Sequence, residues 1–286
     1  MYLYCDFQRN MEAINSKTLN KQSALLLALL NGQDKKAFTL KEAYHLSPGT
    51  THFAVRRMLS GMVKRGLLMR VKDGVFYIIP YENDPETFMP DWHLLAEYLV
   101  GGSKYYIGYY SAMQIHDLIT QPALIEQIVV NKQIKPSYLK IKDITFQFIY
   151  HNEQHFFGSK KIWIDNFNKA PCSDLEKTFI DTLYKPEYAG GITEIAKGLY
   201  KSKDKIDFDK LLQYAIKFDT LAVFKRLGYL LELLEIENRI ISQLQKKETK
   251  AYYLLEPSRP KSGKMLSRWH IQENVDRQSI ISPVFS

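Results

Sequence analysis

Two adjacent arginines in segment 50–65 have the chemistry and spacing of a helix that reads DNA. Arg56 and Arg57 fall between apolar residues that recur at helical spacing, so we expect both on the exposed face. The planar guanidinium group of arginine can donate two parallel hydrogen bonds to one guanine in the major groove. Polar residues at the start of the same helix would also meet base edges. The candidates for reading bases are Thr51, His52, Arg56 and Arg57.

Four further basic side chains are better placed for phosphates than for bases. Two lie at the end of the same predicted helix, and two lie in or directly after the predicted strand that leads into the turn at Asp73-Gly74. Contacts to phosphate oxygens position a protein on DNA without reading its sequence. The phosphate candidates are Lys64, Arg65, Arg70 and Lys72.

The elements that position these side chains are predicted in the order of a winged helix-turn-helix. Thr39 and Glu42 have the spacing of a capping box, which starts the second helix. Asp-Gly between two β-rich runs indicates a hairpin, which would form the wing. The third helix should bury Val55, Met58, Leu59, Met62 and Val63. We expect helices over 20–30, 39–46 and 50–65, and strands over 67–71 and 75–79.

The positive charge of the chain is concentrated near these residues. The 286 residues have a formal net charge of +8, and residues 1–80 hold 12 basic and 5 acidic side chains, a net charge of +7. The other 206 residues have a net charge of +1. A basic module joined to a neutral domain favours a polyanionic partner, with nucleic acid ahead of a membrane surface.

The rest of the sequence gives only weak evidence for a catalytic or metal-binding site. His151 and His155 have a metal-like spacing but no third ligand nearby, and a surface turn explains them better. Cys172 has no assigned base, and no phosphate-binding glycine loop is present. Glu176 is interpreted as the capping partner of Ser173. We therefore predict no enzyme, no cofactor and no metal site, and we set aside a nuclease made from Asp165, Asp174, Glu176 and Lys177.

Two further groups of residues admit a nucleic-acid interpretation and a structural one. Lys225 and Arg226 would bind toxin, RNA or phosphate, or would simply lie on a solvated face. A cluster of tyrosines would stack on bases or pack between helices, and core packing is favoured because the surrounding domain has little net charge. These tyrosines are Tyr105, Tyr106, Tyr109 and Tyr110.

The remaining sequence predicts a second domain and an α+β fold. Residues 1–19 are expected to form a tail, 20–80 the winged module, 81–90 a linker and 91–286 the C-terminal domain. The C-terminal domain should begin with helices and continue with a small antiparallel sheet, before the helical period returns at Ser173. Strands are expected over 125–130, 139–141, 144–150, 161–166 and 252–255, and helices over 91–100, 107–118, 192–200, 208–218, 220–234 and 237–246.

The location of the protein is expected to be the cytoplasm. The longest apolar runs are too short to span a membrane, and no secretory signal is visible. Cys5 and Cys172 make neither a disulfide framework nor a metal motif. Met11 is an alternative start to Met1.

Four segments resemble, in the same order, the AbiE antitoxin family of abortive-infection (viral defence) regulators. They are Val55–Pro80, Tyr105–Leu118, Ser173–Leu183 and Ala222–Leu231, so the resemblance extends over most of the chain from about Asn20. Asp117 stands where the family pattern predicts glycine, which weakens detailed statements about the turn after that helix.

The resemblance implies a type IV antitoxin that represses its own operon by binding inverted repeats in double-stranded DNA, with two copies as a dimer on the DNA. It also implies a functionally linked nucleotidyltransferase-like toxin that is countered without a stable complex. Two alternatives stay open: a protein-interaction adaptor without sequence-specific DNA binding, and a nucleic-acid enzyme that uses the C-terminal domain.

Overall fold

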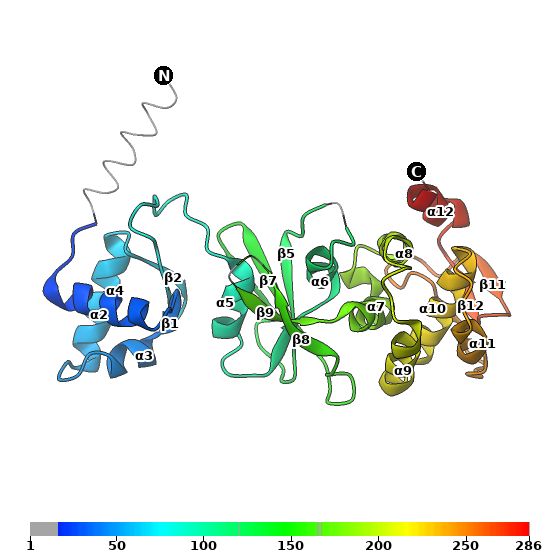
Figure 1. Ribbon diagram of the computed structural model, residues 1–286, viewed down its shortest axis with the longest axis horizontal. Coiled ribbons are helices and arrows are strands. Elements are labelled where there is room, and N and C mark those ends of the chain that lie inside the picture. The colour runs from blue at the N-terminus through cyan, green and yellow to red at the C-terminus, as the bar shows by residue number, and fades with distance from the viewer. Residues whose placement is uncertain (1–16, 120, 165, 167, 286) are drawn as a thin grey trace, which may run out of the picture. The chain divides into compact units, whose positions relative to one another are not determined.

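Two compact units make up the chain, Met1–Gly102 and Ser103–Ser286. The structure, a computed structural model, describes residues 17–119, 121–164, 166 and 168–285 (Figure 1). Helices and sheets occur in both units, which confirms the predicted α+β class. Residues 1–16, which include Cys5 and Met11, lie outside the described residues.

The N-terminal unit combines helices with a three-stranded antiparallel sheet of order β1-β3-β2. The hairpin is present as predicted, and Gly74 lies at its turn with a positive φ of 70°. β1 was not predicted. It is only three residues long, and its partner strand β3 lies far away in sequence. The elements are α2 (Lys21–Gly32), β1 (Ala37–Thr39), α3 (Leu40–His45), α4 (His52–Lys64), β2 (Leu68–Lys72), β3 (Val75–Ile78) and α5 (Trp92–Leu99).

Side-chain caps start three helices of this unit. Thr39 and Glu42 form the predicted capping box of α3, and the structure adds Thr51 as the cap of α4 and Asp91 as the cap of α5. One face of α4 is buried against the sheet and the other helices, and Val55, Leu59 and Met62 are fully buried. The leucines of α2 divide between core and surface, because Leu26 and Leu30 are buried whereas Leu25 and Leu29 are exposed.

Lys17, near the end of the predicted tail, and the predicted linker both contact the N-terminal unit. The ammonium group of Lys17 is buried and donates hydrogen bonds to the carbonyl oxygens of Pro80, Tyr81 and Asn83 at 2.6–2.8 Å. Pro85 packs over Gly66, where an added Cβ would lie 2.3 Å from the proline Cγ. Lys72 donates to the carbonyl oxygen of Leu99 at the end of α5. The unit therefore extends to Gly102, and our boundary after residue 90 is wrong for α5.

A six-stranded sheet of order β6-β7-β5-β4-β9-β8 opens the C-terminal unit. We predicted an antiparallel sheet, but β5 pairs parallel to β7 and β4 pairs parallel to β9, so the sheet is mixed. The short strands β4 and β9 were missed, and β4 includes Ile107, the first residue of the predicted helix 107–118. The strands are β4 (Tyr105–Ile107), β5 (Ile125–Val130), β6 (Tyr138–Ile141), β7 (Ile144–Tyr150), β8 (Ser159–Trp163) and β9 (Lys169–Ser173).

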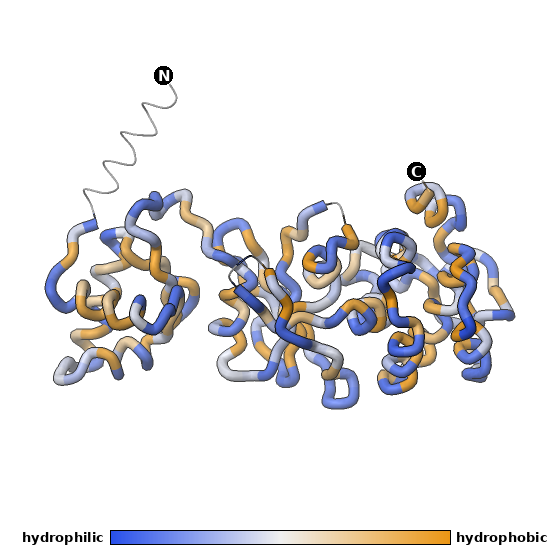
Figure 2. Tube along the Cα trace, viewed as in Figure 1, coloured by the Kyte–Doolittle hydropathy of each residue, from blue (hydrophilic) through white to orange (hydrophobic). Residues whose placement is uncertain are grey.

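Helices that follow the sheet form the largest hydrophobic core of the protein. Figure 2 shows hydrophobic positions recurring along these helices between hydrophilic ones. Asp174, not Ser173, caps α7, while Glu176 accepts hydrogen bonds from the Asp207 amide and Lys210; the predicted capping box is therefore wrong. The elements are α6 (Tyr109–Ile115), α7 (Leu175–Tyr184), the 3-10 helix η1 (Pro186–Tyr188), α8 (Ile192–Lys201), α9 (Phe208–Phe218), α10 (Leu221–Leu233) and α11 (Ile240–Gln245).

The C-terminal residues add a small sheet and a last helix to this core. Trp269 anchors the segment: its ring is buried and lies so close to Gly228 of α10 that an added Cβ would be 2.0 Å away. The elements are β10 (Tyr253–Leu254), β11 (Lys264–Leu266), β12 (Ile271–Glu273) and α12 (Arg277–Phe285). Among the described residues, every helix is too short or too polar to cross a bilayer.

Candidate nucleic-acid interface

The outer face of α4 carries a row of exposed polar and basic side chains. Arg56 and Arg57 lie on this face, opposite the buried Val55, Leu59 and Met62. Neither arginine makes a hydrogen bond or ion pair with any residue that the structure describes. Their guanidinium groups are therefore available to a partner, as the sequence analysis expects.

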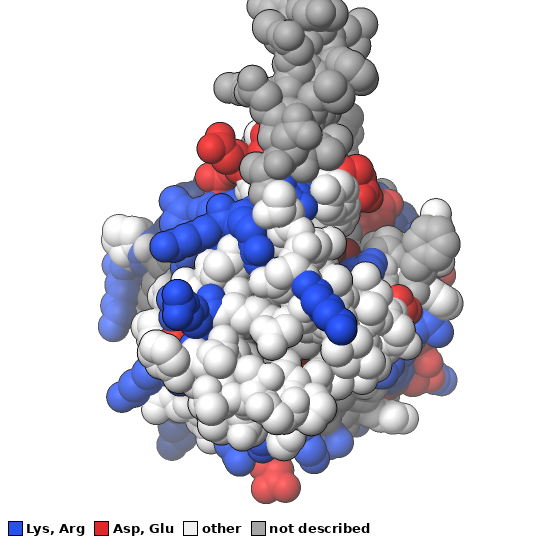
Figure 3. Space-filling view, turned by 90° about the vertical axis from the view of Figure 1, so that its left-hand side faces the viewer, with Lys and Arg blue, Asp and Glu red and all other residues white. Residues whose placement is uncertain are grey.

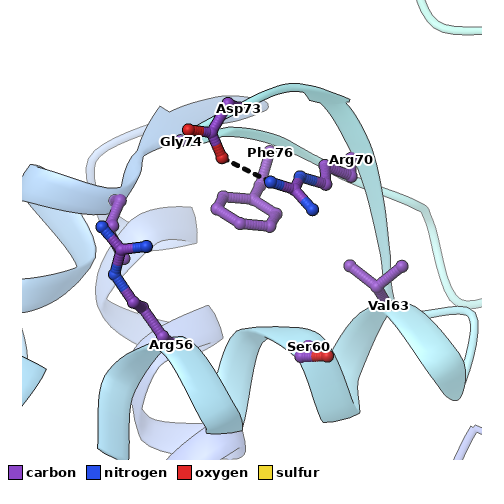
Figure 4. A pocket seen from close by; sticks show the side chains of 8 residues that line it. Arg56, Ser60, Val63, Arg70, Asp73, Gly74 and Phe76 are labelled. Atoms are coloured by element: carbon purple, nitrogen blue, oxygen red, sulfur yellow. Dashed lines mark hydrogen bonds and ion pairs between the residues drawn. The ribbon is translucent and has the colours of Figure 1, made fainter. Parts of the chain in front are cut away.

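A hollow of about 210 Å³ separates α4 from the β2–β3 hairpin. In Figure 4, Arg56 and Ser60 border it from α4, and Arg70 borders it from β2. The Arg70 guanidinium pairs with the carboxylate of Asp73 at the hairpin turn, and both side chains remain exposed. The hollow is thus bordered by the free guanidinium group of Arg56 and by the Arg70–Asp73 ion pair, whose carboxylate offsets part of the positive charge there.

The two predicted base readers that precede the arginines already have contacts inside the unit. The Thr51 hydroxyl accepts a hydrogen bond from the Ala54 amide at 3.2 Å and so caps α4. The His52 ring stacks on Tyr44 of α3, with 3.5 Å between ring centroids and 11° between planes. These contacts fix the first turn of α4, so both residues are better described as positioning residues than as free readers.

The phosphate candidates also divide into free and engaged side chains. Lys64 is exposed and makes no polar contact within the described part of the chain. Arg65 donates to the Ser23 hydroxyl at 3.2 Å and ties the end of α4 to α2. The Lys72 ammonium is half-buried on the Leu99 carbonyl oxygen, and burial lowers its pKa. Lys64 is therefore free for a phosphate, and Arg70 is exposed but already paired with Asp73. Arg65 and Lys72 hold the unit together.

One exposed residue of α4 was missed by the sequence analysis. Phe53 is 76% exposed, the largest exposed fraction among the described large hydrophobic side chains. The signal was present in the sequence, because position 53 precedes Val55 by two residues and so points away from the buried face of a helix.

The charge argument changes once the boundary of the unit is known. Residues 81–102 add 5 acidic and no basic side chains, so Met1–Gly102 has a net charge of +2 and Ser103–Ser286 one of +6. The predicted excess of charge in the N-terminal module is therefore a property of residues 1–80 alone. Figure 3 shows Lys and Arg side chains around a broad uncharged area on one face. The candidate interface therefore depends on the exposed basic side chains of α4 and not on the net charge of the unit.

The C-terminal unit holds a buried polar cluster instead of an open site. Lys177 and Asp181 of α7 pair inside the core, and the Lys177 ammonium also donates to the Tyr106 hydroxyl at 3.0 Å. Tyr106 donates to Asp181, and the ring nitrogens of His151 lie 3.3 Å and 2.8 Å from the hydroxyls of Tyr106 and Tyr109. All five side chains are buried. His151 is therefore not a surface turn residue, and the two tyrosines pack in the core as expected.

Burial dominates the protonation of this cluster. It lowers the pKa of His151 to about 2, with the nearby Lys177 charge acting in the same direction, so the imidazole is neutral. Burial lowers the pKa of Lys177 and raises that of Asp181, while their mutual attraction opposes both shifts. No group of three or more potential metal ligands occurs among the described residues.

The remaining candidate residues of the C-terminal unit are also buried. Lys225 donates to the Lys247 carbonyl oxygen, and Arg226 donates to the carbonyl oxygens of Leu183, Tyr184 and Leu254. Both interpretations of this pair, an anion site and a solvated face, are therefore wrong. The Cys172 thiol is buried, and burial raises its pKa far above the usual range.

Comparison with known proteins supports the fold alone. No protein-family model and no curated protein matches this sequence. The structure is similar to the crystal structure of the RV2827C protein from Mycobacterium tuberculosis, with a TM-score of 0.67 and 12% sequence identity. The similarity covers 94% of this chain and 97% of that one, so the same arrangement of elements extends over both proteins.

Proposed function

We propose that this protein is a DNA-binding transcriptional repressor whose N-terminal unit is a winged helix-turn-helix. The single observation that carries the proposal is the pair of exposed, unpaired arginines on α4 beside the β2–β3 hairpin. The order α2, β1, α3, α4 and hairpin, with the sheet order β1-β3-β2, is typical of winged modules. In this proposal α4 is the recognition helix and the β2–β3 hairpin is the wing.

The dimensions of α4 fit the major groove of DNA. Its 13 residues extend about 20 Å, and a helix with its side chains is about 10–12 Å across, close to the width of the groove. Arg56 and Arg57 then meet base edges, while Lys64 and Arg70 lie nearer the phosphates. Two copies on an inverted repeat would place their recognition helices one helical turn apart, about 34–36 Å.

The direct test is binding to the DNA upstream of the protein's own gene. We expect the full chain to shift this fragment and to protect an inverted repeat, with an affinity that falls steeply as salt increases. An unrelated duplex of the same length is the control. Equal affinity for both duplexes at every salt concentration would overturn the repressor proposal.

We further propose that the protein acts as the antitoxin of a type IV toxin–antitoxin system in the cytoplasm. The support is the resemblance of four ordered segments to the AbiE antitoxin family, so this part of the proposal depends on sequence. Its partner would be a nucleotidyltransferase-like toxin encoded beside it, countered without a stable complex. The role is binding, with no catalytic step.

Co-expression with the toxin distinguishes the antitoxin role from the repressor role. A neighbouring nucleotidyltransferase gene, expressed alone, should stop growth, and the full chain should restore growth. Fragment 1–102 should repress the promoter without restoring growth, because the proposal assigns the antitoxin role to the C-terminal unit. Rescue by fragment 1–102 alone would contradict that assignment.

Phe53 also favours a second function, a protein-interaction adaptor. A large apolar side chain exposed on α4 would suit an apolar pocket of another protein. The adaptor function requires that the full chain has no preference among duplexes, so the same upstream fragment distinguishes the two.

A further inference from the structure

The exposure of Phe53 is unusual because of where the residue lies. Single exposed apolar residues are common on protein surfaces, but Phe53 lies on the helix that also carries the exposed Arg56 and Arg57. Phe53 contacts no other aromatic ring among those that the structure describes, whereas Phe38 and Phe76 of the same unit are buried and stacked. Its ring is therefore available to a partner that approaches α4.

Helix geometry places this ring on the same face as the two arginines. Arg56 and Arg57 follow Phe53 by three and four residues, the spacing of neighbours on one face of a helix. The backbone around Phe53 is held by the Thr51 cap and by the stacking of His52 on Tyr44. The ring is thus presented from a fixed first turn beside two guanidinium groups.

The major groove offers one apolar group to such a ring. The C5-methyl group of thymine lies there, and apolar side chains recognise it by contact. Phe53 and the arginines are separated along the helix axis by about 4.5–6 Å, at 1.5 Å per residue. That separation corresponds to one or two base-pair steps of about 3.4 Å.

We propose that Phe53 reads the methyl group of a thymine one or two base pairs from a guanine contacted by Arg56 or Arg57. This inference rests on the proposed DNA-binding function and names the base that the site selects. The operator half-site would then contain an A·T pair in which the thymine methyl, not a hydrogen-bonding edge, determines affinity.

Replacement of thymine by uracil tests the contact, because it removes the methyl group and keeps every base-pairing atom. The probe is a duplex selected from a random pool by the full-length protein, together with copies in which each thymine is replaced singly. Burial of one methyl group is worth about 0.8 kcal/mol, which corresponds to about a fourfold change in Kd per half-site. We expect this loss at one thymine of each half-site.

Variants of Phe53 test whether its side chain causes the discrimination between thymine and uracil. Phe53→Ala should bind the thymine and uracil duplexes equally, and Phe53→Leu should retain most of the discrimination. The matched control is Leu25→Ala, an exposed apolar residue of α2, which should keep the full fourfold effect. Thermal melting of each variant establishes that it is folded.

The outcomes separate this inference from the function on which it rests. If no duplex is enriched from the pool, the DNA-binding proposal itself fails. If a duplex is enriched but no uracil substitution changes its affinity, or if Phe53→Ala still discriminates, the assignment of Phe53 is wrong and the DNA-binding proposal survives.

Discussion

Arg56-Arg57 on α4 and Lys225-Arg226 on α10 are similar in sequence and opposite in structure. Each is a pair of adjacent cations in a helix with apolar neighbours, and each suggests an anionic partner. The first pair is exposed and unpaired, whereas the second is buried and donates its hydrogen bonds to backbone carbonyl oxygens. The exposed pair is available to bind a partner, whereas the buried pair stabilises the fold.

The surroundings of each helix explain the difference. α4 buries one face, and its remaining residues meet solvent. α10 is enclosed, since all nine residues from Val223 to Leu231 are buried. A cation on an enclosed helix needs internal acceptors, because an unpaired buried charge is very costly. A basic pair therefore indicates a binding surface only where the helix has a solvent-exposed face.

The largest expected effect is on the buried pair. Arg226→Ala would leave three carbonyl oxygens without their donor, and burial of this guanidinium already lowers its pKa to about 10. We expect the free energy of unfolding to fall by about 3–5 kcal/mol, measured by chemical denaturation. Arg239→Ala removes an exposed ion pair with Asp209 and is the control, with a change below about 1 kcal/mol. Equal losses of stability in the two variants would show that the buried Arg226 stabilises the fold no more than an exposed arginine does.

The second effect is on DNA binding. Arg56→Ala with Arg57→Ala should weaken binding to the selected duplex by about 1–3 kcal/mol for each lost base contact. The free energy of unfolding should change by less than about 0.5 kcal/mol, because neither side chain has a partner in the described structure. Lys21→Ala, at the exposed start of α2, is the matched control in a mobility-shift titration. Unaltered affinity of the double variant would show that α4 does not read the DNA.

The third effect is the pH dependence of stability that the buried His151 gives to the C-terminal unit. The pKa of His151 is about 2 in the folded protein and about 6.5 in the unfolded chain, so the unfolded state takes up the proton first as pH falls. Stability from this residue is complete above about pH 6.5 and is lost between about pH 6.5 and pH 2. From pH 7.5 to 5.5 we expect a loss of about 1.4 kcal/mol in the C-terminal unit.

His155 and His116 also have lowered pKa values and contribute in the same direction. His151→Gln should therefore flatten the pH dependence of the denaturation midpoint without abolishing it. An unchanged slope in this variant would mean that the imidazole of His151 does not remain neutral in the folded protein.

The smallest effect concerns a phosphate contact. Lys64→Ala should weaken DNA binding similarly for specific and unrelated duplexes, and should reduce the slope of log K against log salt by about 1 per bound copy. The slope is measured by titration at several salt concentrations. A change confined to the specific duplex would reassign Lys64 as a base reader.

Local signals in the sequence predicted much of the N-terminal unit. The Thr39–Glu42 capping box and the apolar spacing of α4 depend on neighbouring residues, and both are present in the structure. The exposure of Arg56 and Arg57 followed from the same spacing. Phe53 could have been found in this way, since its position on the helix is equally readable.

Long-range contacts account for what was missed. β1 and β4 are short, and each pairs with strands that lie far away in sequence, β1 with β3 and β4 with β5 and β9. The contact of Lys72 with Leu99 and the burial of Lys177, Lys225 and Arg226 depend on elements that meet only in the folded chain. Periodicity places a cation on a helix but does not reveal whether another element covers it.

The central claim is that the N-terminal unit contains the DNA-reading surface although its net charge is only +2. The most direct measurement compares fragments 1–102 and 103–286 for binding to the selected duplex over a range of salt concentrations. Fragment 1–102 keeps α5 and the carbonyl acceptors of Lys17, so we expect it to fold and to retain specific, salt-dependent binding. Specific binding by fragment 103–286, with none by a folded fragment 1–102, would contradict the account.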